Sequence, residues 1–337
     1  MKKIIAILAL GIMGFSALAQ DDAQSIAAEA AEAIAAAAKE VEITPMPKYW
    51  TPTMVIDLGI NQTSLSHWAA GGYNTANFYG GIDAHADFAK NLATWTNRLQ
   101  MQYGFLWSSD KDDLLQKSTD LFYLESKYAY KTKAESKWSY TASFDFRSQF
   151  SNGYTYNTPA EGQSWLDAAT LKSGLLSPAY TNIALGMEWA PNDWFNINIA
   201  PLTGGFTICR LEELRPTYGM ELKPDYEDYA EEDLLGSYYR AAKFQFGAQI
   251  KANLKFMINE VFAYETQLVL FSDYLDHPEN LRVNWDNKVA WQIAKYFKLG
   301  FNTWLIYDPI VTIDGKQRIQ FKEFTSFTFT YTIQRKS

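Results

Sequence analysis

The chain contains very little cysteine and histidine. Among its 337 residues there is one cysteine, Cys209, and there are three histidines, His67, His85 and His277. A single thiol cannot form an internal disulfide. The sequence also lacks a Walker-type phosphate loop, a zinc-protease helix and a nucleophile elbow. We therefore expect no cofactor and no enzymatic activity.

Long hydrophobic runs and an excess of positive charge are also missing. Thirty basic residues face 38 acidic ones, for a formal net charge of −8. This acidic balance argues against nucleic acid as a partner, because the negatively charged phosphates bind to basic surfaces. Ile4 to Phe15 is a short apolar run, and nothing after it approaches the roughly 20 apolar residues of a membrane helix.

The N-terminal region predicts three successive segments. Lys2 and Lys3, the apolar run and the Ala17–Ala19 stretch together predict a signal peptide over 1–19. Residues 20–43 are rich in alanine and predict one periplasmic helix. Residues 44–53 contain three prolines and predict a linker before a domain spanning 54–337.

Residues 243–256, KFQFGAQIKANLKF, alternate between polar or glycine and apolar side chains without a fault. Aromatic residues make up 16% of the chain. Long alternating strands rich in aromatics are typical of a transmembrane β-barrel. The alternation predicts an all-β, single antiparallel barrel of about twelve strands: Met54–Asn61, Asn74–Phe88, Leu92–Trp107, Leu121–Tyr130, Lys137–Phe150, Tyr180–Trp189, Trp194–Thr203, Tyr239–Leu254, Val261–Phe271, Arg282–Ile293, Phe297–Tyr307 and Ile319–Ile333.

The predicted connections alternate between short and long. The long ones cover 62–73, 108–120, 151–179, 204–238, 272–281 and 308–318, with Gly204 and Gly205 expected to turn the chain after a strand. Outer-membrane barrels place short turns in the periplasm and long loops outside. An even strand count then places both chain ends in the periplasm and the long loops outside the cell.

Aromatic spacing fits the height of a membrane. Trp95 and Trp107 are twelve residues apart on one face, as are Trp138 and Phe150. Twelve residues extend about 40 Å, or roughly 28 Å of height when tilted about 45°, close to the apolar band of about 25 Å. We predict that these four residues belong to the aromatic girdles.

A soluble β-sandwich also alternates, but it does not need fourteen-residue strands with aromatics at both ends. The membrane barrel is therefore the preferred interpretation, with lipid against the apolar face. The opposite phase predicts the residues that face the lumen: Asp83, Asp87, Arg98, Arg147, Lys243 and Lys251.

Asp83, His85 and Asp87 alternate along one strand and share a face. They are candidate metal ligands if neighbouring strands add further groups; the alternative is an ordinary hydrated lumen wall. A second cluster of carboxylates lies between Glu221 and Asp233 and could attract a hard cation. It lacks the spacing of an EF-hand, so a solvated acidic loop is favoured.

A barrel phospholipase would need a Ser–His pair on the lipid-facing surface. None of the three histidines occupies a lipid-facing phase. This arrangement argues against lipid hydrolysis.

The first long loop reads SLSHWAAGGYN, residues 64–74. Its Trp68-Ala69-Ala70-Gly71-Gly72 resembles the opening of a family of uncharacterised Bacteroidota outer-membrane proteins, a domain of unknown function. The resemblance covers about Thr53 to the C-terminus. It implies an outer-membrane barrel and assigns no activity or site residues. The alternating Phe327, Phe329, Tyr331 and Ile333 are similar to the terminal strand that barrel-assembly machinery binds.

Two functions remain open on the sequence. A non-enzymatic barrel could pass small solutes through a polar lumen, since about twelve strands leave a narrow interior. Alternatively, a closed barrel could act as a structural or interaction subunit through its extracellular loops or N-terminal helix. The expected partners are outer-membrane lipid, the barrel-assembly machinery and other envelope proteins; plugging, solute, partner and oligomeric state are left open.

Overall fold

The computed structural model describes residues 49–63, 75–309, 312–313 and 316–334. The chain divides into two units, Met1–Trp50 and Thr51–Ser337, and the second contains the fold. The predicted signal peptide, helix and most of the linker lie outside the described residues. Within the described ranges, no helix is long and apolar enough to cross a membrane.

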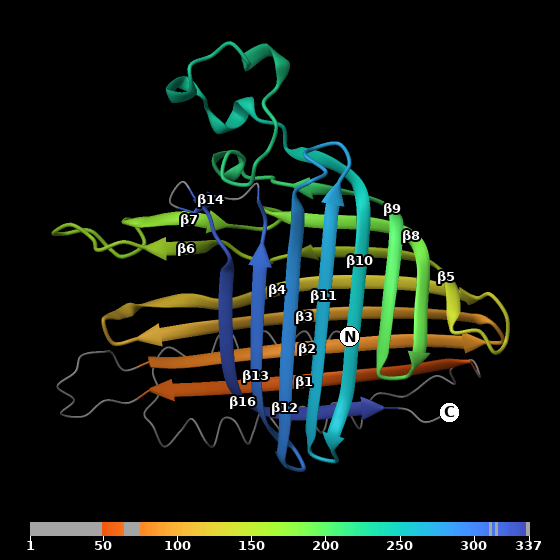
Figure 1. Cartoon of the computed structure of the whole chain (residues 1–337). Coiled ribbons are helices and arrows are strands. Elements are labelled where there is room, and N and C mark those ends of the chain that lie inside the picture. Colours follow the sequence, from red (N-terminus) through yellow and green to blue (C-terminus); the bar gives the residue numbers. More distant parts are fainter. Residues whose placement is uncertain (1–48, 64–74, 310–311, 314–315, 335–337) are drawn as a thin grey trace. The chain divides into compact units, whose positions relative to one another are not determined.

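Twelve antiparallel strands form one closed barrel, which confirms the predicted fold class (Figure 1). Each strand pairs with the barrel strand that follows it in sequence, and the last pairs with the first. The strands are β1 (Trp50–Thr63), β2 (Thr75–Lys90), β3 (Ala93–Ser108), β4 (Lys111–Lys131), β5 (Trp138–Ser148), β8 (Ala179–Asn192), β9 (Phe195–Ile208), β10 (Ala242–Asn259), β11 (Phe262–Asp273), β12 (Leu281–Ala294), β13 (Phe297–Tyr307) and β16 (Gln320–Gln334).

Strands β1 and β16 close the barrel. Their register pairs Met54 with Ile333 and Ile60 with Phe327. On the opposite face of this ladder, the Thr330 hydroxyl donates to Asp57 Oδ1 over 2.6 Å. The first strand begins at Trp50, inside the segment expected to be a linker.

Asparagine side chains shape the short turns at one end of the barrel. Asn91, between β2 and β3, has a φ of 53°, a left-handed conformation that asparagine tolerates better than most residues. Asn192 Oδ1 accepts a hydrogen bond from Phe195 N over 2.9 Å, and Asn259 Oδ1 accepts one from Val261 N over 3.0 Å. Local polar side chains thus fix tight reversals between long strands.

The opposite end carries the longer connections. The segment between β5 and β8 contains a small hairpin, β6 (Gly153–Tyr156) with β7 (Ala169–Ser173), and the β13–β16 connection contains β14 (Thr312–Ile313) with β15 (Lys316–Gln317). The segment between β9 and β10 contains four short 3-10 helices: η1 (Glu212–Leu214), η2 (Pro224–Tyr226), η3 (Glu231–Asp233) and η4 (Gly236–Tyr238). We call these two ends the turn end and the loop end.

Two predicted connections are wrong. The expected loop 108–120 is a tight turn at Ser109 and Asp110, after which β4 extends for 21 residues. Its first half, KDDLLQKSTD, is largely polar, so apolar alternation could not reveal it. Gly204 and Gly205 do not turn the chain but lie within β9. A Cβ on Gly205 would stand 2.0 Å from the Thr181 carbonyl oxygen, so the close approach of β8 requires glycine.

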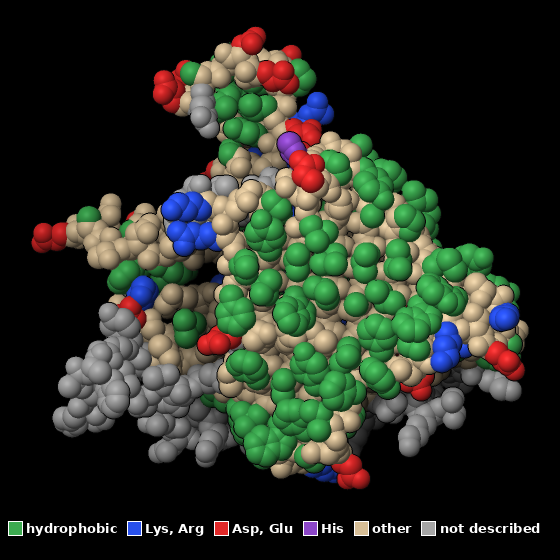
Figure 2. Space-filling view, viewed as in Figure 1, with side chains coloured by type: hydrophobic (Ala, Val, Ile, Leu, Met, Phe, Trp, Pro, Cys, Tyr) green, Lys and Arg blue, Asp and Glu red, His purple; other side chains and the backbone are tan. Residues whose placement is uncertain are grey.

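Large hydrophobic side chains cover the outside of the barrel instead of filling a core. Outward residues on strands all around it are exposed, including Trp95, Tyr128, Tyr140, Ile183, Phe206, Phe244, Ile250, Trp285, Phe301 and Phe327. Figure 2 shows this hydrophobic cover on one wall, with charged side chains gathered toward the ends. Polar residues occupy the alternate positions and face inward.

Candidate functional site in the barrel interior

An ion pair crosses the barrel interior. Lys251 Nζ on β10 lies 2.6 Å from Glu125 Oε1 on β4, although β5, β8 and β9 separate these two strands around the wall. The Tyr123 hydroxyl donates to the other Glu125 oxygen over 2.9 Å. The pair can form only if the two walls lie close enough for side chains to span the space between them. We call the Lys251–Glu125 pair the lumen bridge.

Further polar contacts surround the lumen bridge. Lys127 Nζ on β4 lies 2.5 Å from Glu188 Oε2 on β8. Asn182 donates to Asp145 Oδ1 over 3.0 Å. A cavity of about 30 Å³ remains between these groups, lined by Glu125, Lys127, Ser143, Asp145, Glu188, Asn198, Gln249, Lys251 and Asn253. A cavity of that size has room for about two water molecules, so the side chains around the lumen bridge are closely packed.

The candidate metal ligands lie in a second interior cluster. Asp83 is held by two hydrogen bonds from Arg98, of 2.9 and 2.6 Å, and its Oδ1 is 3.0 Å from His85 Nε2. Both oxygens of the Asp83 carboxylate, which a metal would need as a ligand, are therefore already bound by the Arg98 guanidinium. Within the part of the chain that the structure describes, no group of three or more His, Cys, Asp or Glu side chains is arranged to hold a metal ion.

Opposite charges on different sides of the barrel also interact across the interior. Arg98 on β3 interacts electrostatically with Glu265 on β11, and Arg147 on β5 with Asp286 on β12. These strands lie on different sides of the barrel. The interior thus contains charged groups of both signs.

Lys243, which was predicted to face the lumen, makes its contact at the loop end. Its Nζ is 2.8 Å from Asp276 Oδ2 in the connection between β11 and β12. His277 follows in the same connection, is exposed and lies 3.0 Å from Glu279. His67 lies outside the described residues. His85 contacts the interior Asp83, so neither described histidine offers a Ser–His pair to lipid.

The predicted girdle residues lie on the outer face. Trp95 and Trp138 are each 42% exposed. The Trp95 indole donates to Ser126 over 2.8 Å, and Trp138 packs on Trp189 with ring centroids 6.4 Å apart. Trp107 is half-buried on β3. Phe150 lies just beyond β5, 42% exposed and edge-on to Phe122 at 5.7 Å.

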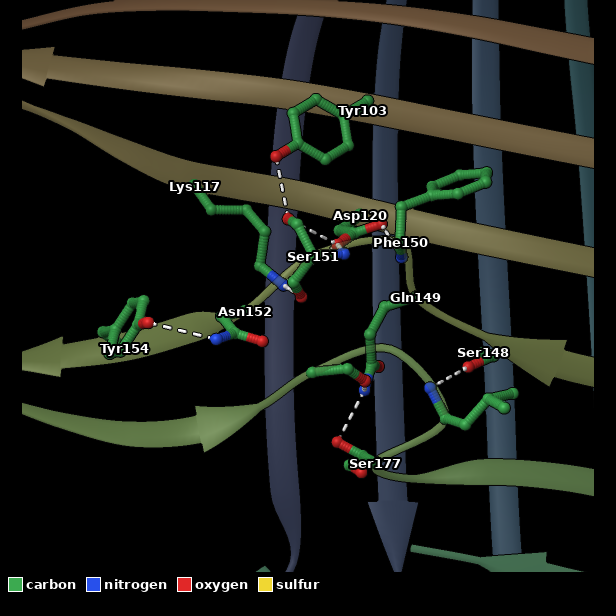
Figure 3. Close-up of polar contacts among 12 residues, drawn as sticks. Tyr103, Lys117, Asp120, Ser148, Gln149, Phe150, Ser151, Asn152, Tyr154 and Ser177 are labelled. Atoms are coloured by element: carbon green, nitrogen blue, oxygen red, sulfur yellow. Dashed lines mark hydrogen bonds and ion pairs between the residues drawn. The ribbon is translucent and has the colours of Figure 1, made fainter. Parts of the chain in front are cut away.

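Asp120 anchors the start of the connection between β5 and β8 (Figure 3). Its side chain is only 2% exposed and accepts hydrogen bonds from Phe150 N at 2.8 Å and Ser151 N at 2.9 Å. Lys117 Nζ lies 3.0 Å from Asp120 Oδ2 and donates to the Ser151 carbonyl over 2.9 Å. Buried charged groups thus fix this long connection to β4.

Gln149 fixes the other side of the same connection. Its side-chain amide donates to the Gly174 and Ser177 carbonyls over 2.6 and 2.7 Å. The chain leaving β5 and the chain returning to β8 are thereby held together (Figure 3).

The connection between β9 and β10 has a small hydrophobic cluster of its own. Cys209, Leu214 and Met220 are buried, and Leu171 of β7 packs against them. Arg215, also buried, donates to the Cys209 carbonyl over 3.2 Å and the Tyr239 carbonyl over 3.2 Å. Burial raises the pKa of the Cys209 thiol, which keeps it protonated and unreactive. The structure therefore gives this long segment a fixed surface.

The acidic run within that segment faces solvent. Asp225, Glu227, Asp228, Glu232 and Asp233 are all exposed. Beside them the rings of Tyr226 and Tyr238 are stacked with centroids 4.0 Å apart, and Tyr229 lies edge-on to both. The described surface is thus an aromatic cluster with an acidic border.

Sequence reasoning did not identify Glu125, Lys127, Glu188, Asp120 or Arg215. Glu125 lies on the inward phase of its strand, which was a usable signal. Nothing in the sequence pairs it with Lys251, because that contact depends on how close the two walls lie.

Comparison with known proteins finds one family model that is similar to part of the chain. Residues 60–154 match the model of a family described as "Protein of unknown function (DUF3078)". A search of curated proteins found no match.

Among solved structures, the chain is similar to an outer membrane channel of the COG4313 group from Pseudomonas putida F1, with a TM-score of 0.37 and 10% identity over 87% of this chain and all of that one. It is also similar to the translocator domain of the autotransporter NalP from Neisseria meningitidis, with a TM-score of 0.36 and 8% identity over 92% and 96% of the two chains. These values assign no activity to this chain.

Proposed function

We propose that this protein is a non-enzymatic β-barrel of the bacterial outer membrane. The observation that carries the proposal is the reversal of polarity across the wall: large hydrophobic side chains are exposed outside, and charged pairs lie inside. In lipid, only a closed barrel or a helix satisfies every backbone group. Twelve strands with no free edge meet that requirement.

The turn end faces the periplasm in this proposal, and the loop end faces the outside. Short turns on the periplasmic side are the rule for such barrels. An epitope tag inserted within Asp225–Asp233 should be labelled on intact cells, whereas a tag at Asn91 should be labelled only after the outer membrane is opened. The reverse labelling pattern would refute the orientation.

Within the membrane, the geometry best supports a barrel that is closed at rest and acts as an interaction subunit. The lumen bridge and its neighbours occupy the interior between β4 and β10. Meanwhile the loop end presents fixed surfaces, organised by Asp120 and Arg215. A packed lumen together with ordered loops supports recognition of another envelope protein more than free diffusion of solutes.

Passage of small solutes is the second candidate, favoured by one observation. The interior carries paired charges of both signs that water could solvate once the pairs separate. In this case the lumen bridge is the gate. The predicted roles of the N-terminal helix in partner binding and of the assembly machinery in insertion stay predictions.

Conductance in planar bilayers separates the two functions. The wild-type barrel should show no steady conductance at low voltage, and Lys251→Met combined with Glu125→Gln should raise it by removing the lumen bridge. Lys255→Met is the matched control, since Lys255 is far more exposed and pairs with the adjacent Glu265 at 2.8 Å. Steady conductance of the wild-type protein would favour solute passage and refute the closed barrel.

A further inference from the structure

Four polar side chains form a continuous row across the outer wall of β11, β12, β13 and β16. The register pairs Thr266 on β11 with Asn287 on β12, Asn287 with Thr303 on β13, and Thr303 with Glu323 on β16. Directly paired residues share one face of a sheet. That face is the outer one, because it also carries the exposed Trp285, Phe301 and Phe321. We call these four residues the polar row.

The two halves of the polar row differ in their hydrogen bonds. The Thr266 hydroxyl donates to the Asp286 carbonyl over 3.0 Å and accepts from the Trp285 indole over 2.8 Å. Asn287 Oδ1 accepts from the Tyr264 hydroxyl over 2.8 Å. By contrast, across the described parts of the chain no side-chain hydrogen bond or ion pair satisfies Thr303 or the exposed Glu323.

The unsatisfied half lies well inside the apolar band. Thr303 and Glu323 are each six residues along their strands from the Phe297–Phe329 pair at the turn end. Six residues extend about 20 Å, or about 14 Å of height at a tilt of about 45°, which is near the middle of a band of about 25 Å. Lipid chains offer no hydrogen-bond donor at that depth.

We propose that the Thr303–Glu323 half of the polar row is the centre of a lateral dimer interface, and that a second copy of this chain covers it. In a two-fold interface, residue i of one copy meets residue j of the other, and the reverse contact also forms. Thr303 supplies a hydroxyl donor and Glu323 a carboxylate acceptor on neighbouring strands, about 4.8 Å apart. A two-fold axis between β13 and β16, along the membrane normal, pairs each donor with the acceptor of the other copy.

The flanking side chains suit the same partner. Phe301 is two residues from Thr303 on β13, and Phe321 is two residues from Glu323 on β16, so each lies on the same outer face as its neighbour. Their side chains are 43% and 62% exposed and border the polar pair. Two such borders, brought together by the same axis, shield the central hydrogen bonds from lipid. The patch therefore satisfies its own polar groups without requiring a partner of different chemistry.

The inference rests on the proposed membrane location. The first experiment therefore measures membrane location and dimerisation separately, so that failure of one is distinguished from failure of the other. Full-length protein is fractionated with outer membranes and then reconstituted in lipid nanodiscs for native mass spectrometry. The wild type should be a dimer, and Glu323→Leu should weaken dimerisation at least about tenfold through loss of two equivalent hydrogen bonds. Thr181→Leu, the matched control on the outer face of β8, should leave the dimer intact.

A wild-type monomer that still fractionates with the outer membrane would overturn the dimer and leave the proposed function standing. Absence from the membrane fraction would refute the proposed function itself. An unchanged Glu323→Leu dimer would also overturn this interface.

Cross-linking provides the second, fold-independent test. In a Cys209→Ser background, differently tagged copies carrying Thr303→Cys or Glu323→Cys are co-expressed and oxidised in native membranes. A disulfide between the two tagged copies is expected, and none is expected between copies carrying Thr181→Cys and Phe206→Cys. Equal cross-linking of both pairs, or cross-linking of position 323 to a different protein instead, would refute the second copy as occupant.

Discussion

Replacing Ile250 with arginine is the most direct test of which face meets lipid. Ile250 lies midway along β10, is 38% exposed and pairs with Ile199 and Leu270 on its two neighbours. An arginine on the lipid face near the midplane costs about 2–4 kcal/mol, falling to about 0–1 kcal/mol at the interfaces. Ile250→Arg should therefore lower the free energy of unfolding by about 2–4 kcal/mol.

Depth along the same strand gives a graded control. Phe246 is four residues nearer the loop end, about 13 Å along the strand and about 9 Å in height at a tilt of about 45°. Its ring packs edge-on against Tyr274 at 5.9 Å. Phe246→Arg should cost about 1–2 kcal/mol, made up of interfacial exposure and the lost ring pair.

The inward neighbour completes the series. Gln245 contacts Thr207 and Asp273 inside the barrel, so an arginine there keeps a carboxylate partner. Urea unfolding of protein folded into phosphatidylcholine vesicles, followed by tryptophan fluorescence, measures all three variants. If Ile250→Arg is no more destabilising than Gln245→Arg, the assignment of faces is wrong.

Three further predictions concern the interior and the loops. Lys251→Met should destabilise the barrel by about 3–5 kcal/mol in the same unfolding assay, because it leaves the buried Glu125 without its cationic partner. Adding Glu125→Gln should recover part of that loss. If the two substitutions are fully additive in the double variant, the lumen bridge is contradicted. Arg215→Ala should make residues 209–241 sensitive to protease without changing the heat stability of the barrel. Arg240→Ala is the control, because Arg240 is exposed. Equal protease resistance of the two variants would contradict the anchoring role of Arg215. The hydrogen bond from Lys243 lowers the pKa of Asp276 in the folded protein. The contact therefore stabilises the 274–280 connection fully above the ordinary aspartate pKa of about 3.9, and this stabilisation is lost as the pH falls through the lower folded pKa. Hydrogen exchange of the connection should show this loss in the wild type and not in Asp276→Asn.

The strands were predictable where both faces of the wall are chemically distinct. The predicted Phe297–Tyr307 strand matches β13 at both ends, because lipid-phase and interior-phase residues alternate over its whole length. The first half of β4 was missed, because its residues are polar on both phases. Alternation of polar and apolar side chains therefore predicts the part of a strand that has one apolar face, and it does not predict extensions that are polar on both faces.

The interior contacts were less predictable than the strands. Inward phases followed from alternation, and Lys251 was assigned that way. Its partner Glu125 is 126 positions away and reaches it from a strand that is not a ladder neighbour. Such a contact depends on the distance between walls, which strand periodicity does not encode.

The ladder between β1 and β16 has a consequence for how the chain acquires its structure. The hydrogen bond from Thr330 to Asp57 joins residues 273 positions apart, so closure can occur only after nearly the whole chain has been delivered. Contacts of such sequence separation make folding slow. Until then β1 and β13 are open edges that can pair with other chains. A chain ending before Gln320 would consequently be an open, aggregation-prone sheet instead of a smaller barrel. The fifteen residues of β16 therefore decide whether the other eleven strands stay an open sheet or close into a barrel.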